Sequence, residues 1–314
     1  MSARAGEDGA CGAICRLDDE AAREGREAAR APWEGEGPTT FPLVDTHCHL
    51  DFAGNSEELA AVLSRCGGAF SGTCDPRDFE RTQRALADFA PQVRVGLGLH
   101  PWWVADGTCG PEEVSLFERL APRAELVSEV GLDFQPRREP TREVQIEAFT
   151  RVCRAAAKPL AAAVVGAFAD ATAAGRAAAH PVPKKRVMSI HSSKAAACAL
   201  DILERTGCLD ACTCIFHWFS GSQDELSRAI DADCLFSVNE RMLETKRGRA
   251  YARAIPEGRL LLETDAPPKP VARFSPETHM AQLSRTIGLL AEARGADTAA
   301  LAERIATTSR ALFS

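Results

Sequence analysis

The chain has 314 residues, with 37 Lys and Arg residues against 44 Asp and Glu residues, and a net charge of −7. This acidic balance argues against a protein that holds nucleic acid by broad electrostatic attraction, so any phosphate binding must be local. Hydrophobic residues make up 45% of the chain, which excludes wholesale disorder and fibrous folds and is enough for a sizeable core.

The sequence shows no signal for export or membrane insertion. Its longest uncharged apolar run, residues 159–168, is too short to cross a bilayer, and the acidic residues Glu7 and Asp8 occur without an apolar segment behind them. We therefore predict a cytoplasmic protein with no membrane contact. Its 12 Cys residues are then expected to be reduced thiols rather than disulfides.

The composition divides the chain into two parts. Residues 1–40 are rich in Gly, Ala, Arg and Glu and carry few large apolar residues, which predicts a disordered tail. In residues 41–314, short apolar runs alternate with longer amphipathic segments, the pattern of βα units in a single domain. An Ala-rich insertion, residues 159–184, follows the fourth strand and is read as an extra helix, a loop or a poorly ordered appendage. The candidate strands are residues 43–47, 69–74, 93–99, 126–130, 187–191, 213–217, 235–238 and 260–264.

Helix-start signals lie between these strands. They are Asp75-Pro76 as N-cap and first helical residue, Thr141 before an acidic first turn, and Ser222 with Glu225 as a capping box. Eight βα units predict an α/β fold, a (β/α)8 TIM-like barrel whose active site forms at the C-terminal ends of the strands. A doubly wound sheet is the alternative, which we disfavour because no Gly-rich phosphate loop follows any candidate strand.

Histidines and two carboxylates collect at the predicted strand ends. Five of the seven histidines lie there: His47, His49, His100, His191 and His217. His47 and His49 are two residues apart, so on an extended strand both side chains point to the same side. Glu129 and Asp265 end the fourth and eighth strands. With these carboxylates, His47, His49, His191 and His217 form a nitrogen and oxygen set that suits divalent Zn, Mn, Fe or Mg ions. Six ligands exceed what one tetrahedral ion with an open position needs, which suggests two ions.

Six motifs follow one another along the chain. They are Val-Asp-Thr-His-Cys-His-Leu-Asp (44–51), Gly-Leu-His-Pro (98–101), Ser-Glu-Val-Gly-Leu-Asp-Phe (128–134), Ser-Ile-His-Ser (189–192), Phe-His-Trp-Phe-Ser-Gly (216–221) and Glu-Thr-Asp-Ala-Pro (263–267). Together they resemble the TatD family of metal-dependent deoxyribonucleases, over residues 43–314. This resemblance implies a metallo-dependent hydrolase barrel that cleaves phosphodiester bonds in DNA, often from the 3′ end, with two divalent ions such as Zn, Mn or Mg.

The resemblance also implies a division of the ligands between the two ions. His47, His49 and Asp265 would hold one ion. His191 and His217 would hold the other, and Glu129 would bridge them.

Two positions depart from the pattern of the family. Ser193 stands where many members have Arg, and Lys194 is the candidate partial replacement for that phosphate-binding group. Pro268 stands where an aromatic residue is common. Both departures bear on substrate and rate and leave the predicted ligands intact. The motifs at 189–192, 217–221 and 236–239 are more similar to a TatD-like branch found within bacterial anti-phage gene clusters, which implies protein partners in a defence system.

The ligand set predicts how water would be activated. Two ions about 3.5–4 Å apart lower the pKa of bound water and neutralise the charge that develops on a phosphodiester. We predict that Asp265 orients the attacking water and accepts its proton, with Glu129 as the second catalytic carboxylate.

Four further residues are candidate substrate contacts. His100 and Lys194 are expected to contact phosphate. Trp102 and Phe134 follow strand ends and are expected to stack on bases of DNA that is single-stranded or has free ends. Packing under the barrel rim is the alternative for both rings.

Two other functions remain open at this point. A binuclear site of this kind also hydrolyses amides, esters and lactones in amidohydrolase-type enzymes, because activated water serves those bonds as well. Alternatively, the chain is a non-catalytic subunit of a defence complex that retains metal for stability.

Overall fold

The computed structural model describes residues 42–161 and 185–313. The predicted tail, residues 1–40, lies outside these ranges, and so does the Ala-rich insertion from residue 162 to 184. Both predictions therefore stay predictions. Among the described helices, none combines the length and the apolar character that a membrane crossing requires.

Eight strands of the described chain form one parallel sheet in which each strand pairs with the next in sequence. They are β1 (Asp45–Cys48), β2 (Ala69–Gly72), β3 (Val93–Leu99), β4 (Leu126–Asp133), β5 (Arg186–Ser193), β6 (Cys212–His217), β7 (Leu235–Val238) and β8 (Leu260–Leu262). The ends of the sheet also meet. The Thr46 hydroxyl donates to the Leu262 carbonyl at 2.9 Å, and the Asp265 amide donates to the His47 carbonyl at 2.9 Å. The sheet is thus a nearly closed barrel, which confirms the predicted (β/α)8 class.

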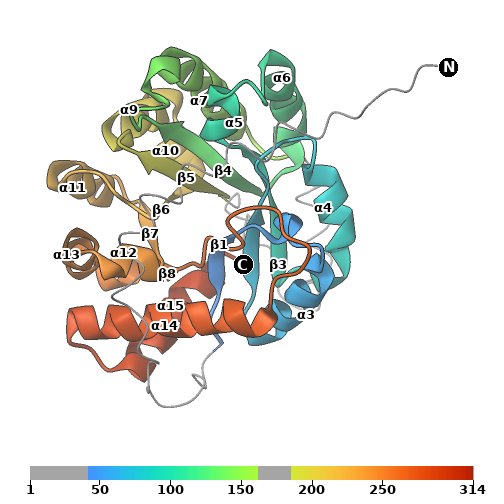
Figure 1. The fold of residues 1–314 in the computed structure, drawn as a ribbon. Helices are drawn as coiled ribbons and strands as arrows, with labels where there is room; N and C mark the ends of the chain where they lie inside the picture. The colour runs from blue at the N-terminus through green and yellow to red at the C-terminus, as the bar shows by residue number, and fades with distance from the viewer. Residues whose placement is uncertain (1–41, 162–184, 314) are drawn as a thin grey trace, which may run out of the picture. The chain divides into compact units, whose positions relative to one another are not determined.

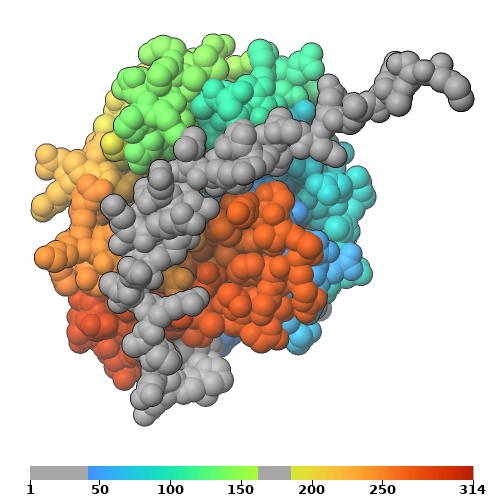
Figure 2. Space-filling view, viewed as in Figure 1, coloured from blue at the N-terminus to red at the C-terminus, as the bar shows by residue number. Residues whose placement is uncertain are grey.

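Helices surround the strands in chain order, from α3 and α4 through α7 and α9 to α14 and α15 (Figure 1). The space-filling view from the same side shows these segments following one another around the surface, from blue and cyan through green to orange and red (Figure 2). The helices are α3 (Ser56–Cys66), α4 (Phe79–Ala85), α5 (Pro101–Ala105), α6 (Pro111–Leu120), α7 (Arg142–Ala156), α9 (Ala196–Thr206), α10 (Cys208–Ala211), α11 (Gln223–Asp231), α12 (Glu240–Glu244), α13 (Lys246–Ala254), α14 (Pro276–Arg294) and α15 (Thr298–Ala311). Short 3-10 turns lie at Leu50–Phe52, Ala87–Phe89, Ala121–Arg123, Glu139–Thr141 and Glu257–Arg259.

The predicted helix starts are right at two positions and wrong at one. Ser222 and Glu225 form the expected capping box of α11, and α7 begins directly after Thr141. Asp75 does not cap a helix, because α4 begins only at Phe79. The Asp75 carboxylate instead accepts the backbone N–H of Arg77 at 2.8 Å and pairs with the Arg77 guanidinium, which fixes a turn before the helix.

The end of the described chain closes the N-terminal end of the barrel. Apolar side chains from β2, β4, β5, β6 and β8 form one cluster, and Phe313 packs against it. The Phe313 ring lies 4.6 Å from the Phe70 ring, and the Arg94 guanidinium lies 5.1 Å from the Phe313 ring centroid while also donating to the Leu312 carbonyl. The floor of the barrel is therefore a packed apolar layer, and polar side chains gather at the opposite ends of the strands.

Candidate metal centre

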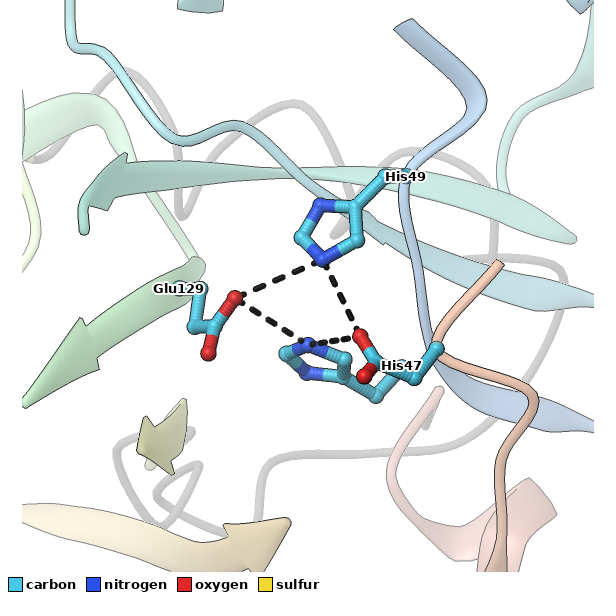
Figure 3. Close-up of side chains that lie close together, drawn as sticks. His47, His49 and Glu129 are labelled. Carbon is cyan, nitrogen blue, oxygen red and sulfur yellow. Dashed lines mark ion pairs between the residues drawn. The ribbon is translucent and has the colours of Figure 1, made fainter. Parts of the chain in front are cut away.

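The six predicted ligands come together at the C-terminal side of the barrel. One ligand atom from each member of the first group lies within 4.8 Å of those of the others, and this group is His47, His49, Glu129 and Asp265. A second group, within the same limit, is Glu129, His191 and His217. Figure 3 shows His47, on β1, and His49, directly after it, pointing toward the Glu129 carboxylate on β4. The structure thus contains two overlapping groups that share Glu129 and could each hold a metal ion.

Glu129 lies inside β4 and not at its end, which corrects the sequence-based placement. Between Val127 and Val130, β4 advances by three residues, while β3 and β5 each advance by two. The extra residue makes a β-bulge, a device that redirects a side chain next to an active site. The Glu129 amide leaves the ladder and donates to the Thr73 carbonyl at 3.0 Å, and its side chain is 2% exposed.

Gly131 explains why the strand continues past the predicted end at residue 130. A glycine reads as a strand breaker in the sequence, yet here it adopts a φ of +143° within β4. A Cβ atom at this position would collide with the backbone carbonyl of His191 on β5. The absence of a side chain therefore lets β4 run beside β5 as far as Asp133.

His47, on β1, and His49, directly after it, direct their Nε2 atoms into the site. The Nδ1 atom of His49 lies 3.0 Å from the Gly72 carbonyl oxygen, which only accepts, so Nδ1 carries a proton and Nε2 is the nitrogen available to a cation. That Nε2 lies 3.4 Å from Glu129 and 3.3 Å from Asp265. The Nδ1 atom of His47 lies 2.7 Å from the Ser189 hydroxyl. Both rings are held from behind as metal-ligating histidines are.

The surroundings of the Nε2 atom of His47 indicate whether the first group of side chains could bind a cation. It is buried and has no hydrogen-bond partner among the described residues, with Glu129 at 3.5 Å and Asp265 at 3.7 Å. A buried imidazole nitrogen without a partner is costly unless a further group binds it. Two imidazole nitrogens and two carboxylates around one point suit a divalent ion, so the donor set fits.

The second group converges on the other Glu129 oxygen. The Nε2 atom of His217 lies 2.7 Å and the Nδ1 atom of His191 lies 2.8 Å from Oε1 of Glu129. These two nitrogens are 3.3 Å apart. The His217 ring also stacks on the His47 ring, with centroids 4.0 Å apart and planes within 2°. The two oxygens of Glu129 therefore face different histidines: Oε1 faces His191 and His217, and Oε2 faces His47, His49 and, at 3.1 Å, His100.

The surrounding imidazoles keep both carboxylates ionised. Burial would raise the pKa of Glu129, but His100 and His217 hold that pKa well below its ordinary value. Burial would likewise raise the pKa of Asp265, yet the contact with His49 and the charge of His217 lower it. The Asp265 side chain is 22% exposed, more than that of any other predicted ligand. Asp265 is thus an ionised carboxylate that reaches the opening of the site.

The same contacts make two histidines more basic. Burial alone would lower the pKa of His49, but Cys74 and Asp265 raise it well above its ordinary value. The pKa of His217 is raised well above its ordinary value against the effect of burial, chiefly by Glu129. Without a bound cation, both rings therefore stay doubly protonated to a higher pH than an ordinary histidine does.

Zinc binding is expected to release these protons. A raised pKa means that each ring stays protonated to a higher pH, so zinc affinity should fall as the pH drops below the pKa values of His49 and His217. With two protons displaced, the fall is about a hundredfold per pH unit. Calorimetric titration with zinc at pH 7, in two buffers of different ionisation enthalpy, measures the number of protons released. Zinc binding without proton release at this pH would show that the rings are already neutral.

His100 has the opposite arrangement to His47 and His49. Its Nδ1 atom accepts the backbone N–H of Trp102 at 3.1 Å, so Nε2 carries the proton and lies 3.1 Å from Glu129. Burial lowers the pKa of His100, which favours the neutral ring. Although Cys74, His100 and Glu129 are close enough to hold a cation, this tautomer makes His100 a hydrogen-bond donor and not a ligand. A contact between His100 and phosphate requires a hydrogen-bond donor of this kind, and that contact stays a prediction.

The other predicted substrate contacts differ in their surroundings. Phe134 is 6% exposed and packs in the main core, with the Arg142 guanidinium 4.4 Å from its ring centroid, which favours the packing alternative over stacking on a base. One face of Trp102 is covered by Arg138 at 3.9 Å. Lys194 is exposed directly after β5, and its role stays a prediction. The hydroxyl of Ser193, the departure noted above, accepts a hydrogen bond from the side-chain amide of Gln135 at 2.9 Å.

Sequence reasoning missed the polar groups behind the ligands. The Oδ1 atom of Asp45 accepts a hydrogen bond from the backbone N–H of His47 at 3.1 Å. Its Oδ2 atom lies 2.6 Å from the Thr264 hydroxyl and 2.6 Å from Nε2 of His279. Glu263 is fully buried, and its Oε1 lies 3.7 Å from Nδ1 of His217. The signal was present, because each is a charged residue within an apolar strand run next to a predicted ligand.

Comparisons with known proteins agree with this geometry. A family model described as TatD related DNase matches residues 44–165 and 177–314. The chain is 32% identical over 110 residues to the 3′-5′ ssDNA/RNA exonuclease TatD of Dickeya dadantii (strain 3937), a match that covers 32% of this chain and 40% of that protein. It is 25% identical over 285 residues to the uncharacterized metal-dependent hydrolase YjjV of Escherichia coli (strain K12), covering 86% and 97%. The crystal structure of the TatD homologue YjjV from Escherichia coli K12 superposes with a TM-score of 0.63 at 22% identity, again covering 86% and 97%, and shows the same fold.

Proposed function

Because the chain belongs to the TatD related DNase family, we propose that it is a metal-dependent hydrolase that cleaves phosphodiester bonds in DNA with two divalent ions. The observation that supports this most directly is the shared Glu129. Its Oε1 atom faces two imidazole nitrogens at 2.7 and 2.8 Å and its Oε2 atom faces three at 3.1–3.5 Å, in a chain whose net charge is −7. Two bound cations would supply locally the positive potential that the rest of the protein lacks.

The proposed roles follow from the direction in which each group faces. His47, His49 and Asp265 would hold one ion, and His191 and His217 the other, with Glu129 between them. A divalent ion in such a set lowers the pKa of water and neutralises charge on the phosphoryl oxygens. Asp265 is the ligand carboxylate most open to solvent, so it is the group placed to orient a water molecule and accept its proton.

The substrate is proposed from the relatives and the donors at the mouth. His100 is proposed as a phosphate contact because its ring carries an N–H donor at the site, although that N–H faces Glu129 in this structure. Directional cleavage from the 3′ end of single-stranded DNA is proposed because the partial relatives are named 3′-5′ exonucleases, and the match spans 40% of the length of the first of them. Partners in a defence system and a cytoplasmic location stay predictions.

Labelled oligonucleotides test the proposed function. Metal-loaded protein should shorten a 5′-labelled single strand into a ladder, because 3′ to 5′ digestion leaves the label on every product, and should release the label of a 3′-labelled strand as a mononucleotide. Metal-free protein and the His47→Ala variant should lose at least about 100-fold of this activity, since each lacks an ion or one of its ligands. Glu303→Ala, on the exposed face of α15, is the control that should retain it.

Three outcomes would contradict the proposal. Equal cleavage by metal-free protein would remove the ions from the reaction. Turnover of an amide, ester or lactone panel without cleavage of DNA would favour an amidohydrolase-type enzyme. Zinc binding without turnover of any substrate would favour a non-catalytic subunit.

A further inference from the structure

Asp133, the last residue of β4, is a buried carboxylate outside the six predicted ligands. It is 1% exposed. Its Oδ2 atom lies 3.2 Å from Nε2 of His191, accepts the indole N–H of Trp102 at 2.6 Å and lies 3.4 Å from the Arg138 guanidinium. Its Oδ1 atom accepts a hydrogen bond from the backbone N–H of Gln135 at 2.8 Å. Both oxygens are thus occupied by donors from the protein itself.

The contact with Asp133 determines which nitrogen of His191 carries its proton. An ionised carboxylate only accepts, so the Nε2 atom that faces it carries the hydrogen. The Nδ1 atom faces the site instead: it lies 2.8 Å from the Glu129 carboxylate and 3.3 Å from Nε2 of His217. A cation bound there would replace any hydrogen on Nδ1, whereas the hydrogen on Nε2 stays with Asp133. His191 is therefore turned the opposite way to His49, whose Nε2 atom faces the site.

We propose that Asp133 is the positioning residue that orients His191, so that His191 offers Nδ1 to a bound cation while His47 and His49 offer Nε2. This inference rests on the proposed function in so far as that function places a divalent ion between Glu129, His191 and His217. Asp133 does not reach the ion or the substrate and acts through the imidazole alone.

The surroundings of Asp133 fix its position from two sides. Gln145, buried on α7, accepts the Asp133 backbone N–H at 2.8 Å and donates to the Asp133 carbonyl at 3.0 Å. On the side-chain face, Arg138 stacks on the Trp102 ring at 3.9 Å, so both donors to Asp133 hold each other in place. In this proposal Trp102 holds Asp133 in place through its indole N–H, a different role from the base stacking expected from the sequence.

Loss of a carboxylate behind a ligating histidine costs about 10- to 100-fold in metal affinity. Only the ion held by His191 should lose affinity directly, because the histidines of the other set are backed by Ser189 and by the Gly72 carbonyl. We therefore expect the protein to bind one of its two zinc ions more weakly and the other with unchanged affinity.

The experiment measures zinc affinity and the state of the His191 ring together. In 15N-histidine-labelled, zinc-loaded wild-type protein, His191 should show a protonated Nε2 and a zinc-bound Nδ1, and His49 the reverse. Asp133→Asn, which preserves shape, and Asp133→Ala should weaken one zinc equivalent by about 10- to 100-fold, as measured by chelator competition. Trp102→Phe removes one donor to Asp133 and should weaken the same equivalent by less than about tenfold.

Trp103→Phe is the matched control. Trp103 packs against the main core beside Phe52 and should leave both equivalents unchanged. Should Asp133→Ala fail to fold, Asp133→Asn and Trp102→Phe still decide the question. Unchanged zinc affinity and an unchanged His191 nitrogen pattern in Asp133→Asn would overturn this inference alone. Failure of the wild-type protein to bind zinc would instead overturn the proposed function.

Discussion

Asp265→Asn is expected to abolish turnover while leaving the fold intact. Asn has the shape of Asp and tolerates the left-handed backbone, φ +56°, that residue 265 adopts. It cannot accept a proton, and general-base catalysis contributes about 10²- to 10⁴-fold to a rate. We expect kcat on single-stranded DNA to fall by that factor. The free energy of unfolding of the metal-free protein should change by less than about 1 kcal/mol.

Steady-state kinetics at saturating zinc or manganese measures this loss. Asp231→Asn, on the exposed end of α11, is the matched control and should behave like the wild-type protein. The zinc equivalents of Asp265→Asn should be counted in the same preparation, because Asp265 is also a proposed ligand. A variant that keeps both equivalents and cleaves DNA within threefold of the wild-type rate would remove Asp265 from the mechanism.

Glu129→Gln is expected to have the broadest effect. Glu129 is the one residue common to both ligand groups, with Oε2 at 3.4 Å from His49 and Oε1 at 2.7 Å from His217. Glutamine replaces one of these oxygens by an NH₂ donor, which is repelled by a cation. We expect both zinc equivalents to weaken and turnover to fall by on the order of 10³-fold, the range seen when a group is removed from a preorganised charged site.

The variant should also change the metal-free protein. Without the Glu129 charge, the pKa of His217 should move down toward its ordinary value, so zinc binding should release fewer protons than in the wild-type protein. Glu139→Gln, exposed in the turn before α7, is the control. Retention of two zinc equivalents at wild-type affinity in Glu129→Gln would contradict the shared carboxylate.

The strands could be predicted because their burial leaves a clear pattern. Strands of a parallel barrel are covered on both faces and read as short apolar runs, and residues 93–99 and 235–238 form β3 and β7 as predicted. The local exceptions depend on contacts that no short window contains. Asp75 binds Arg77 instead of capping a helix, and the bulge at Glu129 depends on pairing with two other strands.

The ligand types could be predicted, but the direction of each ring could not. A histidine stands out in a short apolar run of a buried strand, so His191 and His217 are found without a structure. Which nitrogen faces inward depends on groups distant in sequence, since Asp133 lies 58 residues from His191. The direction of an aromatic ring is equally hard to predict. Phe134 follows a strand, and its ring is buried in the core, although the sequence alone would also allow it to face a ligand.

The packing of Phe313 determines where the protein can be tethered. Phe313 is anchored against Phe70 and Arg94 near the starts of β2 and β3, whereas His217 and Asp265 lie at or beyond the ends of their strands. A purification tag, fluorophore or surface linker attached beyond residue 313 therefore departs from the face opposite the mouth. Immobilised enzyme prepared in this way would keep the opening of its site free, provided that Phe313 itself is retained as the anchor.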